Sequence, residues 1–184
     1  MIWSRLLPLR PSQERDAAAA LYRAVIAQAR EPAFYARFGV PDSVDGRFEM
    51  IALHMFGLLH RLKQEPDAAA LSQELFDIMF VDMDRSLREM GVGDLGVGRR
   101  VRAMAEGLYG RMAAYESGLA AGDAELAAAV RRNVYGTIAD GAVPETALAG
   151  FCGYLRALVV DLGRQSRERL IAGDVTFIPV SSSA

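Results

Sequence analysis

The residues of this chain whose type and spacing most resemble a chemical site belong to the run GVGDLGVG, which begins at Gly91. Its first six residues match the G-x-G-x-x-G pattern of dinucleotide-binding proteins. That pattern works because a buried parallel strand delivers the glycines to a helix N-terminus that binds pyrophosphate. Here a charged, amphipathic helical pattern precedes them. The run also imitates a phosphate loop, but Arg99 and Arg100 stand where lysine and serine or threonine are needed. We expect no nucleotide site.

Acidic residues and histidines give little support for a metal site. The D-x-D-x-S run from Asp82 imitates half of a calcium loop, but Leu87 replaces the glycine that such a loop requires. His54 and His60 are six residues apart in sequence, which places them about 240° apart around a helix. We predict no metal site. We interpret His54 as a buried, hydrogen-bonded core residue, with a role as a ligand kept as the alternative.

Nucleophilic catalysis has no recognisable machinery in this sequence. Cys152 is the only cysteine, and neither histidine is close to it in sequence. A catalytic thiolate needs an activating base nearby, so we interpret Cys152 as a small core residue. No G-x-S-x-G nucleophile elbow occurs. We therefore predict that the chain is not an enzyme and that it needs no cofactor.

Apolar residues recur every three or four positions along most of the chain, which predicts an all-α fold. We expect one compact domain of about six helices spanning residues 1–184, with peripheral tails at 1–11 and 174–184. Asp42, Ser43 or Asp45 is expected to cap the second helix. We predict six helices. The first runs from Ser12 to about Pro32, and the second ends near Lys63. The others run from Pro66 to Met90, from Val101 to Leu119, from a cap at Asp123 to about Tyr135, and from Leu148 to Gly173.

Glycines should separate the third and fourth of these helices. Gly91 follows Met90 where a helix end favours a residue with positive φ. Gly93, Gly96 and Gly98 are expected to keep the following segment irregular, so that the two helices form a hairpin with a glycine-rich connection. The C-terminal tail is β-prone for a few residues, and we expect it either to pack as an extended strap or to be disordered.

Composition limits the classes of function. The chain has 184 residues, of which 52% are hydrophobic, and a net charge of −2, which suits one domain with a substantial core. The acidic balance argues against a broad nucleic-acid-binding surface. No apolar run approaches the ~20 residues that cross a bilayer, and no export signal follows the first residues. We expect a cytoplasmic protein.

Methionine is concentrated in the three central predicted helices. Its flexible thioether fills irregular cores, and it also suits surfaces that accept varied apolar partners. A groove lined by some of these side chains could hold an apolar helix of another protein. The residues concerned are Met50, Met55, Met79, Met83, Met90, Met104 and Met112.

Three segments together resemble the ubiquinol–cytochrome c chaperone family, which assists assembly of respiratory complex III. They are FYARFGVPDSVDGRFEMIALH (34–54), LSQELFDIMFVDMDRSLREMGVGDLGVGRRV (71–101) and MAEGLYGRMAAY (104–115). The resemblance covers roughly residues 21–115, and the run from Asp82 to Gly98 is its most specific part. The last third of the chain has no comparable motif.

The resemblance implies a mostly helical, non-enzymatic assembly factor that binds newly made cytochrome b. Mitochondrial members of the family act with a partner protein and near the ribosome exit, so a partner assembly factor or the ribosome is a further expected contact. This sequence lacks the dense arginine and serine of a mitochondrial presequence. It therefore resembles a bacterial member acting at the cytoplasmic face of the inner membrane, with peripheral membrane contact.

Our hypothesis for the client-binding surface combines an apolar face with a charged rim. Apolar contact would supply affinity, and the charges would fix the orientation of the client segment. The alternative is that the charged residues pair within the domain and stabilise the hairpin. The apolar residues are Phe48, Met55, Met79, Phe80 and Met83, and the rim residues are Asp82, Asp84, Arg85, Arg88 and Asp94.

A competing class of function is a small-ligand or haem-binding helical protein. His54 lies in an otherwise apolar helix, and the family that the chain resembles assembles a haem protein. In this alternative His54 or a methionine would be an axial ligand to iron.

Overall fold

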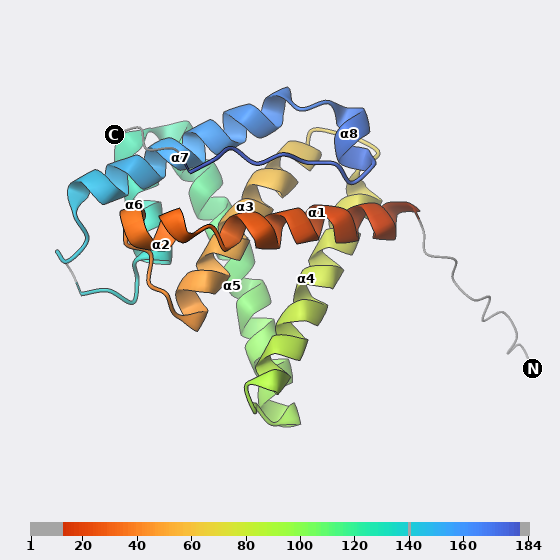
Figure 1. Cartoon of the computed structure of the whole chain (residues 1–184), viewed down its shortest axis with the longest axis horizontal. Coiled ribbons are helices and arrows are strands. Elements are labelled where there is room, and N and C mark those ends of the chain that lie inside the picture. The colour runs from red at the N-terminus through yellow and green to blue at the C-terminus, as the bar shows by residue number, and fades with distance from the viewer. Residues whose placement is uncertain (1–12, 140, 181–184) are drawn as a thin grey trace, which may run out of the picture.

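The computed structural model describes residues 13–139 and 141–180, and its regular structure is entirely helical (Figure 1). The all-α prediction is confirmed: this part of the chain contains eight helices and no strand, where about six helices were expected. The predicted tail at 1–11 and the end at 181–184 lie outside the described residues. The helices are α1 (Gln13–Ala29), α2 (Pro32–Phe38), α3 (Val44–Leu62), α4 (Ala69–Glu89), α5 (Asp94–Ala121), α6 (Asp123–Val134), α7 (Glu145–Arg164) and α8 (Arg167–Ile171).

Helix α3 is the centre of the fold. Fourteen of its 19 residues are buried, which requires neighbours on several sides, and it packs against α1, α4, α5, α6 and α7. Its N-terminus is capped by Ser43, whose Oγ accepts a 3.1 Å hydrogen bond from the backbone N–H of Gly46. One of the three predicted capping residues is therefore the cap.

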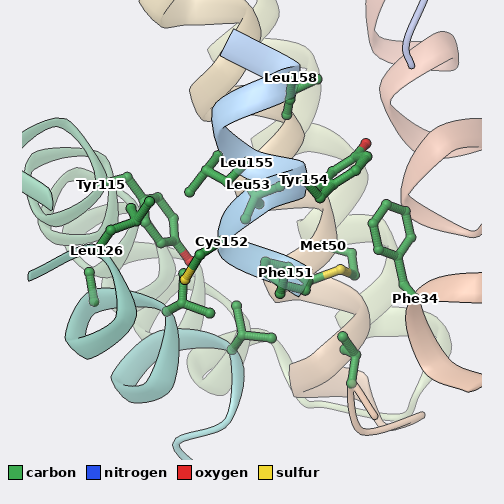
Figure 2. Packing of buried hydrophobic residues seen from close by; sticks show 14 of the residues in the cluster. Phe34, Met50, Leu53, Tyr115, Leu126, Phe151, Cys152, Tyr154, Leu155 and Leu158 are labelled. Atoms are coloured by element: carbon green, nitrogen blue, oxygen red, sulfur yellow. The ribbon is translucent and has the colours of Figure 1, made fainter. Parts of the chain in front are cut away.

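The core has two parts, one on each side of α3. The first lies among α2, α3, α6 and α7 and includes Phe34, Phe56 and Phe151 (Figure 2). The second lies among α1, α3 and α4 and includes Leu21 and Met55. Burial of this apolar surface, at roughly 25 cal/mol per Å², fixes the position of α3 and of the surfaces at its ends.

Helices α4 and α5 form the predicted hairpin, and Figure 1 shows it reaching away from the rest of the fold. Gly91 has a φ of +82° and ends α4 as expected. The connection is shorter than predicted, because α5 begins at Asp94 rather than near Val101. Gly96 and Gly98 are therefore helical. Each costs about 1 kcal/mol relative to alanine, and the complete burial of Val97 between them offsets this cost.

The last predicted helix is broken into two. Helix α7 ends at Arg164, and Ser166 caps α8 by accepting a hydrogen bond from the N–H of Arg169. This break lets Leu170 reach the core beside α1, where it is fully buried. The cap predicted at Asp123 is also wrong, because Gly122 holds the N-cap position and Asp123 forms an ion pair with Arg156 at 2.7 Å.

The described end of the chain, residues 174–180, packs as an extended strap, which was one of the two expectations for the tail. The strap crosses between α1 and α7 (Figure 1). Gln28 donates to the carbonyl of Ile178 at 2.9 Å, and the N–H of Thr176 donates to the side chain of Gln165 at 3.1 Å. Residues far apart in sequence are thereby joined.

Helix α7 is, within the described ranges, the one helix whose length and composition are compatible with crossing a membrane. Core helices of water-soluble proteins share these properties. In this fold Leu155, Leu158 and Leu162 of α7 are completely buried in the first part of the core. Packing inside the domain therefore accounts for part of the apolar character of α7.

Candidate functional site

His54, the histidine with the strongest sequence signal, is completely buried and has both ring nitrogens occupied. Nδ1 lies 2.7 Å from the carbonyl oxygen of Met50, and Nε2 lies 2.7 Å from the hydroxyl of Tyr154. Desolvation lowers the pKa of His54 to about 4, so the ring is neutral at pH 7. In this arrangement His54 has no nitrogen to offer to a haem iron.

Cys152 is buried beside the aromatic residues of the core, as its position in the helical pattern predicts (Figure 2). Burial raises the pKa of its thiol, which disfavours the thiolate. No group of three or more histidine, cysteine or acidic residues gathers in a metal-binding arrangement in residues 13–139 and 141–180.

The five apolar residues of the predicted surface are divided between core and surface. Met55 and Met79 have no exposed area, so neither can contact a client unless the core opens. Phe80 is half-buried and stacks on Phe76 along α4, with ring centroids 6.4 Å apart. Phe48 and Met83 are buried in the core but line an open groove. A helical period identifies an apolar face without saying how deeply it is buried.

The five charged residues of the predicted rim pair mainly with one another. Asp82 and Arg85 lie 2.6 Å apart, and Arg88 binds Asp84 at 2.6 Å. Arg88 also binds Asp94 across the tip of the hairpin. The pairing is what the alternative expected, and a contact of these residues with a client stays a prediction. Exposed pairs of this kind contribute about 0 to 1 kcal/mol each.

Asp82 has a second contact that links the hairpin to α1. Its carboxylate accepts a hydrogen bond of 3.0 Å from the hydroxyl of Tyr22. Burial and the neighbouring carboxylate both raise the pKa of Tyr22, so this phenol remains protonated and a donor. Of the predicted rim residues, only Asp82 also lines an apolar groove beside the hairpin.

An apolar groove of about 950 Å³ opens between the end of α1, α2, the start of α3 and the hairpin. We call it the first compartment. Ile26, Tyr35, Ile51 and Met83 form much of its apolar wall. Its volume is in the range that binds drug-sized ligands or side chains of another protein.

A second compartment of about 710 Å³ adjoins the first and lies between the start of α3, the hairpin tip and the end of α6. The two compartments share five lining residues, so they form one continuous groove around the N-terminus of α3. All five are apolar, and two of them are methionines, whose side chains adapt to varied partners. The shared residues are Val44, Phe48, Leu87, Met90 and Met104.

Two of the shared residues are large apolar side chains that are exposed. Val44 is 55% exposed and Met90 is 50% exposed. Exposed apolar groups that border a concave surface are typical of sites that bind another molecule. Sequence reasoning placed Met90 and Met104 among the methionines of a possible groove but missed Val44, whose exposure depends on the preceding turn and not on a helical period.

A buried ion pair forms the floor of the second compartment. Glu49 is 4% exposed, and the guanidinium of Arg111 binds both of its oxygens, with Nε 2.9 Å from Oε1 and 2.7 Å from Oε2. The same guanidinium lies 5.3 Å from the ring centroid of Phe48. Burial raises the pKa of Glu49 even though Arg111 opposes the shift. No local pattern indicates this pair, because its members are 62 residues apart in sequence.

The family model described as "Ubiquinol-cytochrome C chaperone" matches residues 36–177. The chain is 25% identical over 166 residues to the ubiquinol-cytochrome-c reductase complex assembly factor 1 of Xenopus laevis, a match that covers 89% of this chain and 82% of that protein. It is 27% identical over 131 residues to the mouse protein of the same name, covering 70% of this chain and 44% of that protein.

A solved structure agrees with these relatives. The crystal structure of the Cbp3 homolog from Brucella abortus matches with a TM-score of 0.82 and 39% sequence identity, and the match covers 94% of both chains.

Proposed function

Because this chain belongs to the ubiquinol–cytochrome c chaperone family, we propose that it binds newly synthesised cytochrome b and holds an apolar segment of it in the groove around the N-terminus of α3. The family's role is the assembly of ubiquinol–cytochrome c reductase. The client and the surface that binds it are our inference. The observation that carries the inference is the exposure of Val44 and Met90 on the wall that joins the two compartments.

The groove would hold the client segment through reversible apolar contact. A membrane-protein segment that has not yet reached its partners exposes apolar surface, and burying that surface is favourable by roughly 25 cal/mol per Å². Met83, Met90 and Met104 line the groove, and methionine adjusts its shape to different neighbours without a large penalty. A groove of this kind retains a client and still releases it when a better-fitting partner arrives.

We also propose that the chain acts at the cytoplasmic face of a bacterial inner membrane and performs no chemical transformation. A partner assembly factor or the ribosome is a further proposed contact, and so is peripheral contact with the membrane. These proposals rest on the resemblance to the family. The groove supports a binding role because the wall shared by its two compartments is apolar.

The groove is tested by placing a charge on its wall. Val44→Asp and Met90→Asp are each expected to lower the amount of cytochrome b that co-purifies with the chain by about tenfold, which corresponds to about 1.4 kcal/mol of binding free energy. The abundance of assembled ubiquinol–cytochrome c reductase should fall with it. Circular dichroism and thermal unfolding would establish that both variants are folded.

Two exposed valines outside the groove supply matched controls. Val81 is 71% exposed on α4 and Val160 is 53% exposed on α7, and neither lines a compartment of the groove. Val81→Asp and Val160→Asp introduce the same charge and should leave capture of cytochrome b unchanged. Normal capture by folded Val44→Asp and Met90→Asp would overturn the proposed site, and normal assembly without the chain would overturn the proposed function.

A further inference from the structure

The charged residues that line the groove are not all paired, and those without an ion pair are mostly arginines. Arg47 binds Asp42 at 2.8 Å, Asp82 binds Arg85, and Glu49 binds Arg111. Within the described ranges, the groove-lining cations that form no ion pair are then Arg30 in the first compartment, and Arg100 and Arg132 in the second. All three are exposed.

Among the described residues, Asp45 is the one groove-lining carboxylate that forms no ion pair. The backbone compensates its charge. Asp45 lies in the first turn of α3, where the helix macrodipole favours a negative charge. Arg132 lies in the last turn of α6, where the macrodipole favours a positive charge in the same way, whereas Arg100 lies inside α5. None of the three arginines has a carboxylate partner among the described residues. An occupied groove would bring these three guanidinium groups close to the bound molecule.

The arrangement along the groove is therefore cation, apolar wall, cation. Arg30 belongs to the first compartment only, and Arg100 and Arg132 belong to the second only. Between them lies the apolar wall shared by the compartments, which includes Val44 and Met90. A ligand that matches this order has an apolar middle and an acidic group on each side.

We propose that the groove selects an apolar client segment with acidic side chains at its flanks. Arg30 binds the acidic side chains of one flank, and Arg100 and Arg132 bind those of the other. This inference rests on the proposed function and names the chemistry of the client segment. A guanidinium binds a carboxylate through two parallel hydrogen bonds, which gives orientation as well as attraction. The pairs gain strength when the client displaces water from the groove.

The same charges reject the commonest alternative clients. The short cytoplasmic loops of membrane proteins are rich in lysine and arginine, so many apolar segments exposed in the cytoplasm have basic flanks. Like charges placed together at a binding surface oppose binding and so select against the wrong partner. The groove therefore distinguishes among apolar segments that hydrophobic contact alone would bind equally well.

Three peptides test the selection directly. They share an apolar core of about twelve residues, long enough for roughly three helical turns, and differ only in flanks of glutamate, glutamine or lysine. Fluorescence anisotropy with the whole chain is expected to give binding in the order glutamate, glutamine, lysine, with about tenfold between successive peptides at low salt and much less at 1 M salt. Equal binding of the three peptides would overturn the proposal.

Matched arginine variants identify the residues that read the charge. Arg100→Ala combined with Arg132→Ala should remove most of the preference for glutamate over glutamine, and Arg30→Ala should remove part of it. Arg99 and Arg102 are exposed on the same helix as Arg100, but neither lines the groove. Arg99→Ala combined with Arg102→Ala removes the same number of charges and should keep the preference. Equal losses in the two double variants would mean that net charge, and not the groove, sets the preference.

The proposed function and this inference fail in different ways. If Val44→Asp still loses cytochrome b while the three peptides bind equally, the groove holds a client but does not read charge. If Val44→Asp keeps cytochrome b, the proposed site itself is wrong, whatever the peptides show.

Discussion

His54 of α3 and Tyr154 of α7 are joined by a hydrogen bond of 2.7 Å that fixes the tautomer of the histidine. A carbonyl oxygen can only accept, so Nδ1 of His54 must donate to Met50, and Nε2 must then accept from the Tyr154 hydroxyl. The Tyr154 oxygen in turn accepts from Gln28 at 3.1 Å, and Gln28 also donates to Ile178 of the strap. One buried chain of donors and acceptors thus connects α1, α3, α7 and the strap.

The buried hydrogen bonds of His54 predict that the protein loses stability in mild acid. The pKa of His54 falls from 6.5 to about 4 on folding, so its contribution is fully present above pH 6.5 and is lost as the pH falls to 4. The total loss from this residue is about 3 kcal/mol, because a tenfold change in proton affinity corresponds to about 1.4 kcal/mol. Urea denaturation between pH 4 and 7 measures it.

Two histidine variants separate this effect from general acid denaturation. His54→Gln should flatten the fall of unfolding free energy between pH 6.5 and 4, even though the variant is less stable at pH 7. His60 is partly exposed beside Glu116, and His60→Gln should keep the fall. An unchanged pH profile in His54→Gln would show that other groups cause the loss.

Removing the Tyr154 hydroxyl tests the same chain from its other end. Tyr154→Phe leaves Nε2 of His54 as a buried acceptor without a donor, which is expected to lower the free energy of unfolding by about 1–3 kcal/mol. Tyr109 is 61% exposed, and its hydroxyl forms no hydrogen bond with the described residues. Tyr109→Phe should therefore change stability by less than about 0.5 kcal/mol. Similar effects of both variants would contradict a special role for the buried hydroxyl.

The parts of the fold that the sequence predicted are those that depend on neighbours along the chain. Helical periods, the end of α4 at Gly91, the cap at Ser43 and the burial of His54 all follow from residues within a few positions of one another. The helix through Gly96 and Gly98 was missed because local propensity disfavoured it. The complete burial of Val97 outweighed that propensity.

The groove was only partly predictable because it forms between segments that are distant in sequence. The apolar pattern identified Phe48 and Met83 but could not distinguish them from Met55, which is fully buried. The predicted rim charges pair along one hairpin, as their spacing allows. The arginines left without a partner, such as Arg30 and Arg132, are identified only when the neighbours of every charge are known.

Gly46 and Gly110 are predicted to differ sharply in how replacement by alanine changes the stability of the fold. A Cβ added to Gly46 would lie 1.9 Å from the carbonyl oxygen of Pro41, which belongs to the backbone and cannot move aside cheaply. Gly46→Ala should therefore destabilise the fold by about 3 kcal/mol or more and disturb the groove wall at Val44. The measurement is chemical denaturation monitored by circular dichroism.

Gly110 is the control for this substitution. It lies inside α5, and beyond the neighbouring backbone of its own helix an added Cβ would have no atom within 4 Å. Alanine favours a helix interior over glycine by about 1 kcal/mol, so Gly110→Ala should be neutral or stabilising. If Gly46→Ala were equally well tolerated, the turn would have to shift away from α3.

The buried pair of Glu49 and Arg111 gives the last prediction. Arg111→Met leaves the Glu49 carboxylate buried without a counter-charge, which should lower the free energy of unfolding at pH 7 by about 3–5 kcal/mol. Losing Arg111 raises the pKa of Glu49 further above its ordinary value. The penalty is therefore largest at neutral pH and shrinks as the pH falls toward the ordinary pKa of glutamate, because protonation removes the buried charge.

Pairing the two substitutions distinguishes a lost counter-charge from lost packing. Adding Glu49→Gln to Arg111→Met removes the uncompensated charge, so it should recover much of the stability and abolish the dependence on pH that Glu49 causes. Lys63 and Glu116 form an exposed pair at 3.0 Å, and Lys63→Met should cost less than about 1 kcal/mol. If the double variant is no more stable than Arg111→Met, the contribution of Arg111 comes from its packing on Phe48 and not from its charge.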